Sequence, residues 1–372
     1  MAAKKLKVAI VCDWLLGIGG AERVVFELHK MYPDAPIYTS QYDPTAIDWF
    51  ANADVRTTWL QKLPKSLKKF LPILRAWTFR RLDLSEYDLV ISSSGAEAKG
   101  VHTGPNTMHV CYCHAPTHYY WVRPSEYMAN PGFPRGFNWL ARWSLKLLIR
   151  PLKQWDRHAA QEPDVIVTNS QASADLIKKY YKRDATVVYP PVETARFKPT
   201  GTQEPRHGFI IAGRQVSYKR FDLAIQACNE LKVPLIVIGN GPEHKKLEKM
   251  AERNITFLTN VSDNDIVQHF QSSLGFIFPG MEDFGIVAVE AMAAGTPVIA
   301  YAKGGALDYV IPGKTGLFFE RQTPASLRKV LEVAMTKSFD NEFITEHSNN
   351  YSTATFTKNM RELINQHLGG KE

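Results

Sequence analysis

Short apolar segments alternate with helical patterns along almost the whole chain, and this alternation restricts the fold more than any other feature. In the first half, apolar runs begin near residues 6, 87, 109, 164 and 185. In the second half they are FIIAGR, PLIVIGNG, ITFLTN, LGFIFPG, TPVIAY and TGLFF. Apolar runs separated by helices are typical of parallel sheets covered on both faces. We therefore expect an α/β protein.

A polar stretch rich in proline, residues 189–208, separates the two series and is interpreted as a linker. The chain has 372 residues, more than one hydrophobic core usually serves. The sequence therefore predicts two doubly wound, Rossmann-like domains facing a central cleft, residues 1–190 and 191–350. The amphipathic segment 351–372 is expected to form a final helix that can cross back to the N-terminal domain.

Composition indicates an ordinary folded protein, with 45% apolar and 22% charged residues. Four scattered cysteines are too few for a disulfide framework, which favours a reducing compartment. Asp13 interrupts the first apolar run, so a buried strand is favoured over a signal peptide. The 45 Lys and Arg against 37 Asp and Glu give a formal charge of +8. That balance suits polyanions such as phosphorylated small molecules, anionic lipid or nucleic acid.

The stretch MEDFGIVAVEAMAAGTPVIAY, residues 281–301, places two glutamates around the expected start of a helix. Glu282 falls in a loop at the carboxyl end of a strand, where open α/β sheets bind ligands. Glu290 lies in an apolar run, where hydrogen bonds from ribose hydroxyls would offset the cost of its burial. A phosphate would bind the amides of the first helical turn, those of Phe284, Gly285, Ile286 and Val287. The alternative is that Glu282 caps the helix and Glu290 is a partnered surface residue.

Two further loops carry candidate phosphate-binding groups. Arg214 and Lys219 lie in AGRQVSYKRFD, after the first strand of the second half. An Arg fork and a Lys point charge together suit a diphosphate, although a solvated basic turn is the alternative. Gly19 and Gly20 precede a helix as in phosphate-binding turns, but the full dinucleotide fingerprint is absent from this segment.

The segment CYCHAPTHYYW, residues 111–121, ends a predicted strand in a polar loop. Cys111 and Cys113 share one face of that strand. A second pair with metal-ligand spacing does not appear in the sequence, so we predict small buried residues and no metal site. His114 falls at the strand's carboxyl end, at the rim of the crevice, and a purely structural histidine is the alternative.

Two basic segments, residues 59–81 and 133–157, interleave tryptophan and leucine with arginine and lysine. Such cationic, Trp-bearing segments suit the interface of an anionic membrane. Solvated helices with an apolar inner face are the alternative. Nucleic acid is not expected as a partner, because the sequence carries no recognisable nucleic-acid-binding module.

The segments EDFGIVAVEAMAAGTPVIAYAKGGALDYVIPGKTGLFF, GRQVSYKRFD, GNGPE and NSQASADLI together resemble the motifs of retaining glycosyltransferase family 4, which has the GT-B fold. YDLVISSSGAEAKGV, CYCHAP and VVYPPVE resemble more narrowly the WbaZ-like mannosyltransferases of O-antigen and capsule assembly. The resemblance implies a hexosyltransferase that retains anomeric configuration and requires no cofactor. Its nucleotide-sugar donor would be GDP-mannose, or alternatively a UDP-sugar, and its acceptor a lipid-linked saccharide. A cytoplasmic protein, peripheral on the inner face of the plasma membrane, is expected.

The resemblance also implies roles for individual residues. The implied catalytic residues are His114, Arg214, Lys219 and Glu282. The implied donor-binding residues are Gly19, Gly20, Arg214, Lys219, Glu282, Phe284, Gly285, Ile286, Val287 and Glu290. The implied acceptor-side residues are Asp13, His118, Tyr119 and Trp121. Two positions depart from the branch, since His118 stands where arginine is usual and Val122 where an acid is common.

In these roles Glu282 would contact hydroxyls of the donor sugar and Glu290 the ribose. Arg214 and Lys219 would neutralise the departing diphosphate, and His114 would lie beside the reacting centre. Three other functions are open on the residues alone. They are a glycoside hydrolase using the two glutamates, a nucleotide-sugar epimerase, and a non-catalytic protein that binds sugar nucleotides or lipid.

Overall fold

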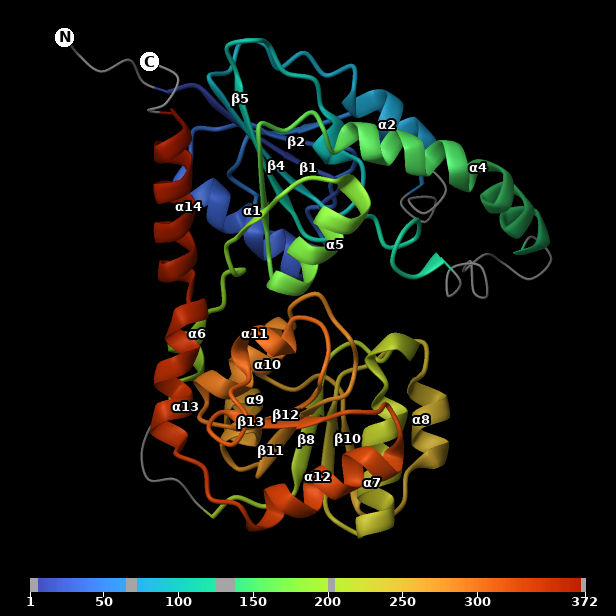
Figure 1. The fold of residues 1–372 in the computed structure, drawn as a ribbon, viewed down its shortest axis with the longest axis vertical. Coiled ribbons are helices and arrows are strands. Elements are labelled where there is room, and N and C mark those ends of the chain that lie inside the picture. Colours follow the sequence, from blue (N-terminus) through green and yellow to red (C-terminus); the bar gives the residue numbers. More distant parts are fainter. Residues whose placement is uncertain (1–5, 65–71, 125–137, 200–204, 369–372) are drawn as a thin grey trace. The chain divides into compact units, whose positions relative to one another are not determined.

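The structure, a computed structural model, describes residues 6–64, 72–124, 138–199 and 205–368, without the side chains of residues 138–147 and 263. The chain forms two compact units. One comprises residues 1–189 with 357–372, and the other residues 190–356. In each unit, helices surround a central sheet (Figure 1).

The first unit is built on a parallel sheet with the strand order β3-β2-β1-β4-β5-β6-β7. Its strands are β1 (Val8–Cys12), β2 (Ile37–Thr39), β3 (Val55–Thr57), β4 (Leu89–Ser94), β5 (Met108–Cys113), β6 (Val165–Thr168) and β7 (Thr186–Val187). Its helices are α1 (Gly20–Met31), η1 (Trp59–Lys62), α2 (Pro72–Phe79), η3 (Ala98–Gly100), α4 (Asn138–Ala159) and α5 (Gln171–Tyr181).

The second unit has a parallel sheet with the strand order β10-β9-β8-β11-β12-β13. The strands are β8 (Phe209–Ala212), β9 (Leu235–Ile238), β10 (Ile255–Leu258), β11 (Gly275–Phe278), β12 (Val298–Tyr301) and β13 (Gly316–Phe319). The helices are α6 (Thr194–Phe197), η4 (Ser217–Lys219), α7 (Phe221–Leu231), α8 (His244–Met250), α9 (Asp263–Gln271), α10 (Ile286–Ala293), α11 (Ala306–Tyr309), α12 (Pro324–Thr336), α13 (Asn341–Ser348) and η5 (Asn349–Tyr351). The last helix, α14 (Thr353–Leu368), begins in this unit and ends in the first.

The central strands are buried on both faces, which confirms the predicted α/β class. Every residue of β1, β4, β5 and β11 is buried. Side chains alternate between the two faces of a strand, so complete burial requires a covering layer on each face. The apolar runs seen in the sequence follow directly from this arrangement.

Each sheet has one point where the strand order reverses. In the first unit this point lies between β1 and β4, and in the second between β8 and β11. The loops that leave the carboxyl ends of two such strands diverge to opposite faces and open a crevice between them. Most predicted site residues lie on the four loops that follow β1, β4, β8 and β11, or at the helix starts after these loops. The exceptions are Glu290 and the residues that follow β5, which are His114, His118, Tyr119 and Trp121.

The stretch 189–208 is not the plain linker that its composition predicts. Within it, α6 forms and Val192 and Phe197 are buried. The Val192 amide donates to the carbonyl of Tyr351 at 3.1 Å, and the Thr353 amide donates to the carbonyl of Val192 at 3.0 Å. The segment around Val192, where the second unit begins, is therefore hydrogen-bonded to the segment 351–353, where that unit ends.

Buried His109 gives the first unit a specific response to acid. The ring lies 2.8 Å from the hydroxyl of Ser92 (Nε2 to Oγ) and is completely buried, and burial lowers its pKa from 6.5 to about 4. Between these values the unfolded chain binds a proton that the folded chain does not. We expect the free energy of unfolding to fall by about 2–3 kcal/mol through this residue as the pH drops from 6.5 to 4.

The measurement is urea unfolding at pH 7 and pH 4.5, followed by tryptophan fluorescence. All eight tryptophans precede residue 190, so the signal reports the first unit. The variant His109→Gln should lose less stability across this interval than the native chain. Equal losses in the two proteins would contradict the assignment to His109.

Candidate active site

The loops after β8 and β11 meet in an ion pair at the reversal point of the second sheet. Lys219 Nζ lies 3.0 Å from Glu282 Oε1, and the two side chains remain 16% and 18% exposed. Gly280 allows this approach, because a Cβ atom there would lie 2.9 Å from the Cα of Lys219. Two residues that the sequence placed on separate loops are therefore in direct contact, and a ligand can still reach them.

The loop after β12 contacts the backbone of Glu282 and holds it in place. The Gly305 amide donates to the Glu282 carbonyl at 2.9 Å. Gly304 has φ +75, and a Cβ atom there would lie 2.5 Å from the same carbonyl oxygen. Only glycine combines this φ with so close an approach. These contacts fix the backbone position from which the Glu282 carboxylate extends.

The next residues turn the chain into α10. Gly285 has φ +100, and a Cβ atom there would lie 2.4 Å from the ring of Phe278. Tyr309 donates a hydrogen bond from its hydroxyl to the Phe284 carbonyl at 3.0 Å. Burial, with a smaller contribution from the charge of Glu282, raises the pKa of Tyr309 well above its usual range, so the phenol keeps this proton. The turn is therefore fixed on both sides of Gly285.

The start of α10 carries the amide donors predicted to bind phosphate, including those of Ile286 and Val287. Amides of a first helical turn have no acceptor within the helix and attract anions. Glu290 lies further along this helix and is 6% exposed. The structure thus places Glu290 in a buried position, as the apolar run around it indicates.

Arg214 and its neighbour Gln215 differ sharply in exposure. Arg214 is exposed on the loop after β8. Gln215 is fully buried and ties this loop to the one after β9, through Nε2 to the Gly239 carbonyl at 2.8 Å and through Oε1 to His244 Nδ1 at 2.7 Å. Gln215 was missed in the sequence, where only its position beside Arg214 points to it.

The first unit has its own cavity, of about 240 Å³, at the reversal point of its sheet. The lining residues come from the ends of β1, β4 and β5 and from the start of α1. They are Cys12, Asp13, Trp14, Ala21, Glu22, Val25, Ser93, Gly95, His114, His118 and Tyr119. The predicted residues Asp13, His114, His118 and Tyr119 are therefore brought together. Trp14 and Glu22 were missed, although both lie on the loop and helix that follow Asp13.

Asp13 organises one wall of this cavity. Its carboxylate accepts hydrogen bonds from the amides of Gly95 and Ala98, each at 2.8 Å, and from the amide of Ala96 at 3.0 Å. These bonds fix the turn after β4. His114 is held by a hydrogen bond between Nε2 and the Ser93 hydroxyl at 2.9 Å. The resemblance assigned Asp13 to the acceptor side; in the structure Asp13 lines the cavity and its oxygens also accept these backbone hydrogen bonds.

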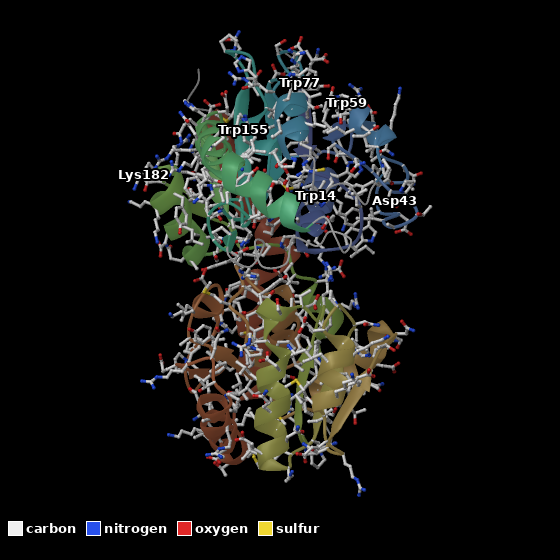
Figure 2. The ribbon with its side chains drawn as sticks, turned by 90° about the vertical axis from the view of Figure 1, so that its right-hand side faces the viewer. Trp14, Asp43, Trp59, Trp77, Trp155 and Lys182 are labelled. Atoms are coloured by element: carbon white, nitrogen blue, oxygen red, sulfur yellow. The ribbon has the colours of Figure 1, made fainter. Side chains whose placement is uncertain are left out.

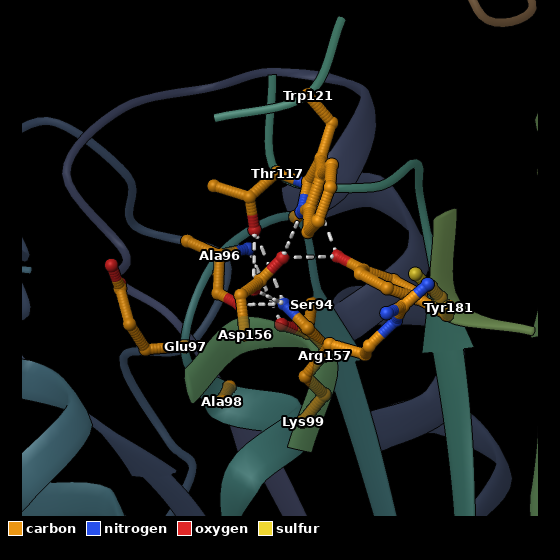
Figure 3. A network of polar contacts seen from close by, with 12 residues as sticks. Ser94, Ala96, Glu97, Ala98, Lys99, Thr117, Trp121, Asp156, Arg157 and Tyr181 are labelled. Carbon is orange, nitrogen blue, oxygen red and sulfur yellow. Dashed lines mark hydrogen bonds and ion pairs between the residues drawn. The ribbon is translucent and has the colours of Figure 1, made fainter. Parts of the chain in front are cut away.

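Trp121, also assigned to the acceptor side, is not among the residues that line the cavity. Its indole donates to Asp156 Oδ2 at 2.7 Å (Figure 3). The same carboxylate accepts from Thr117 Oγ1 at 2.8 Å and pairs with Lys99 Nζ at 2.7 Å. Trp121 thus anchors the segment that carries His118 and Tyr119 rather than facing the cavity.

Gly19 and Gly20 begin α1 in an ordinary conformation. Gly19 has φ −159, an extended geometry that any residue adopts. A Cβ atom at Gly19 would lie 2.7 Å from Glu22 Oε2, so a carboxylate lies beside this helix start. The local geometry gives Gly19 no backbone conformation that requires glycine.

Part of the predicted membrane-facing segment 59–81 is visible on the first unit. Trp59 of η1 and Ile73, Leu74 and Trp77 of α2 are 39–49% exposed, and we call these four residues the α2 patch. The Trp59 indole donates to Thr78 Oγ1 at 3.0 Å, which holds η1 against α2. Trp59 and Trp77 of this patch are labelled in Figure 2. Residues 65–71 and 133–137 lie outside the described part of the chain.

Within residues 6–64, 72–124, 138–199 and 205–368, no group of three or more His, Cys, Asp or Glu side chains is arranged to hold a metal ion. None of the helices in these same ranges has the length and hydropathy needed to cross a membrane.

The two parallel Rossmann-like sheets make up the GT-B fold, and comparison with solved structures agrees with this fold. The Anabaena protein HepE, solved with UDP, matches with a TM-score of 0.70 at 19% identity, over 97% of this chain and 100% of that one. Sucrose-phosphate synthase from Thermosynechococcus elongatus matches with a TM-score of 0.71 at 15% identity, over 98% and 100% of the two chains.

The family models make the assignment more specific. Residues 18–196 match Glycosyltransferase Family 4, and residues 192–354 match Glycosyl transferases group 1. Each model matches somewhat less than half of the chain, and the two matches follow one another along the sequence as the two units do.

Curated relatives carry transferase names. The D-rhamnosyltransferase WbpZ of Pseudomonas aeruginosa is 28% identical over 200 residues, 50% of this chain and 52% of that protein. The α-1,3/1,6-mannosyltransferase ALG2 of Mus musculus is 26% identical over 364 residues, 82% of each. The matched region therefore spans about half the length of WbpZ and most of ALG2.

Proposed function

We propose that the chain transfers a hexosyl residue from a nucleotide diphosphate sugar to a hydroxyl of a saccharide acceptor. The observation that supports this proposal most directly is the accessible Lys219–Glu282 ion pair beside the start of α10. A diphosphate would take Lys219, and the freed Glu282 carboxylate would accept hydrogen bonds from the sugar. The ion pair would thus be replaced by two interactions with one donor molecule.

Departure of the nucleotide builds negative charge on its diphosphate. Lys219, Arg214 and the first amides of α10 would stabilise that charge, as preorganised positive groups do in transition states. The bond between the anomeric carbon and the phosphate oxygen breaks, and the acceptor oxygen bonds to the same face of that carbon. The acceptor's hydroxyl proton passes to the departing phosphate. This sequence retains configuration, and we propose that it proceeds in the presence of EDTA.

GDP-mannose is the donor we propose, and a lipid-linked saccharide of bacterial surface polysaccharide is the acceptor. The name of ALG2 and the resemblance to the WbaZ-like branch support mannose. The UDP bound to HepE keeps a UDP-sugar as the alternative donor.

The test is a screen of GDP-mannose, UDP-glucose and UDP-galactose with and without a lipid-diphosphate saccharide, in EDTA. Acceptor-dependent release of GDP and a lengthened saccharide are expected. Nucleotide release that ignores the acceptor would identify a hydrolase, and conversion of the donor to its epimer an epimerase. Tight nucleotide binding without turnover would support the non-catalytic alternative.

Glu290→Ala is expected to weaken binding of GDP by roughly 10–100-fold, the effect of losing hydrogen bonds to a charged acceptor. Isothermal titration calorimetry gives the Kd. Glu290→Gln keeps one acceptor oxygen and should show a smaller loss. Glu320→Ala, at an exposed site of the same unit, is the control. An unchanged Kd in Glu290→Ala would contradict the ribose role.

We further propose that the α2 patch contacts an anionic membrane, placing the protein on the inner face of the plasma membrane. The patch is flanked by the exposed cations Lys62, Arg80 and Arg81, and the Arg81 guanidinium lies 4.0 Å from the centre of the Trp77 ring. Exposed tryptophan next to positive charge is the combination that suits a lipid interface.

Binding to vesicles that contain phosphatidylglycerol should fall when Arg80 and Arg81 are both changed to Gln, and fall again when Trp77→Ala is added. Vesicles of phosphatidylcholine alone should bind weakly. Lys178→Gln, at an exposed site on α5, is the control and should bind as the native chain does. Binding that persists in high salt would contradict the electrostatic account.

A further inference from the structure

Two buried charged residues that the proposed reaction does not use lie directly behind the first-unit cavity. Arg75 of α2 and Glu97, in the turn after β4, are 3% and 1% exposed. Their contact is bidentate, with Arg75 Nε 2.7 Å from Glu97 Oε2 and Nη2 3.3 Å from Oε1. Burying two charges is costly even when they are paired.

Each member of the pair also holds one aromatic residue of the cavity. The Arg75 guanidinium lies 5.0 Å from the centre of the Trp14 ring, within cation–π range. The Tyr119 hydroxyl donates to Glu97 Oε1 at 2.6 Å. Trp14 and Tyr119 both line the cavity. One ion pair therefore supports two aromatic walls that come from different loops.

The polar residues that line the rest of the cavity indicate which kind of ligand would contact Trp14 and Tyr119. Glu22, Ser93, His114 and His118 contribute a carboxylate, a hydroxyl and two imidazoles to the same cavity. A volume of about 240 Å³ equals roughly eight water molecules, the scale of one small ring. A sugar ring presents an apolar C–H face to aromatic side chains and a hydroxyl edge to polar ones. The cavity offers both kinds of surface at that size.

We propose that Arg75 and Glu97 are positioning residues that set Trp14 and Tyr119 around the terminal sugar ring of the acceptor. This inference rests on the transfer function proposed above. It concerns the affinity for the acceptor, because neither charged residue lines the cavity or reaches the reacting atoms.

The first test separates acceptor binding from turnover. Tyr119→Phe, Glu97→Gln and Arg75→Met should each raise the acceptor KM by roughly three- to tenfold, with kcat and the donor KM nearly unchanged. Arg75→Lys, which keeps the charge without the fork, should lie between Arg75→Met and the native chain. A purely structural role would instead lower the active fraction and hence kcat. An unchanged acceptor KM in folded Tyr119→Phe and Glu97→Gln would overturn the proposal.

Tyr87→Phe is the matched control for Tyr119→Phe. It also removes a partly buried phenol hydroxyl of the first unit, the one that lies 2.9 Å from the hydroxyl of Tyr38. Tyr87 is not among the residues that line the cavity. The control should keep the native acceptor KM, and a rise equal to that of Tyr119→Phe would overturn the specific role of the pair.

A second test does not require activity. In protein labelled with 5-fluorotryptophan, the ¹⁹F resonance missing from Trp14→Phe is that of Trp14. Methyl α-D-mannopyranoside should shift this resonance in the native chain, and Glu97→Gln should shift or broaden it without any sugar. A Trp14 resonance identical in Glu97→Gln and the native chain would overturn the positioning role. A native chain without acceptor-dependent transfer would instead refute the proposed function, so the two failures are distinguishable.

Discussion

Lys219→Ala is expected to lower kcat by roughly two to three orders of magnitude, the loss typical of removing one group that stabilises transition-state charge. In the structure Lys219 lies on the loop after β8, 3.0 Å from Glu282, and 16% of its side chain is exposed. The proposed role places its ammonium group on the departing diphosphate. Because the charge grows as the bond breaks, kcat should fall more than nucleotide affinity does.

Nucleotide release in the presence of donor and acceptor gives kcat, and calorimetry gives the Kd for GDP. Lys219→Arg keeps the charge with a different geometry and should recover part of the rate. Lys232→Ala is the control, since Lys232 belongs to the same unit and forms an exposed ion pair with Glu252. Full turnover in Lys219→Ala would rule out the diphosphate role.

The fold could be predicted because buried parallel strands impose a local pattern. VAIVC, LVISSS and GFIF lie in strands with every residue buried, so each strand appears as a short run that the eye can find. The stretch 189–208 could not be predicted in the same way. Its prolines and polar residues suggest a linker, whereas the burial of Val192 depends on pairing with a segment near residue 352.

The site was predictable where topology alone brings residues together. Arg214, Lys219 and Glu282 were placed on loops at strand ends, and the reversal between β8 and β11 makes two of those loops neighbours. Side-chain direction was not predictable. The sequence does not show that Asp13 bonds to the turn after β4 or that Trp121 bonds to Asp156, because both partners are distant along the chain.

The buried ion pairs that hold the site residues in place cannot be recognised from the local sequence. Arg75 and Glu97 belong to separate elements, and only the packing of α2 against the turn after β4 makes them partners. The same holds for Lys99 and Asp156. A buried charge is stable only with its partner, so such residues can be identified once the tertiary contacts are known. These supports are also where single substitutions should cost most.

Asp156→Asn is expected to lower the free energy of unfolding of the first unit by about 3–5 kcal/mol, the cost of leaving a buried charge without its partner. Asp156 is completely buried, and its carboxylate forms an ion pair with one group and accepts hydrogen bonds from three others (Figure 3). They are Lys99 Nζ at 2.7 Å, Thr117 Oγ1 at 2.8 Å, Trp121 Nε1 at 2.7 Å and the Tyr181 hydroxyl at 2.7 Å. An amide has one acceptor oxygen and carries no charge, so it cannot satisfy all four.

Lys99 decides the size of this effect. Burial lowers the pKa of its ammonium group, but the charge and hydrogen bond of Asp156, together with Tyr181 and Cys113, raise the pKa well above its usual range. Without the Asp156 charge, the largest opposing contribution to burial is lost, and burial then favours a Lys99 that loses its proton or moves into water. Either change disturbs Thr117, to which Lys99 donates at 3.2 Å, and with it the segment that carries His118 and Tyr119.

Urea unfolding followed by tryptophan fluorescence measures the loss, because every tryptophan belongs to the first unit. Asp184→Asn is the matched control. Asp184 pairs with Lys178 at 2.9 Å, but these side chains are 89% and 73% exposed. Water screens such a pair, so its loss should leave the free energy of unfolding almost unchanged. Equal effects of the two substitutions would mean that Lys99 keeps its proton by another route and that the Asp156 network does not hold the cavity segment in place.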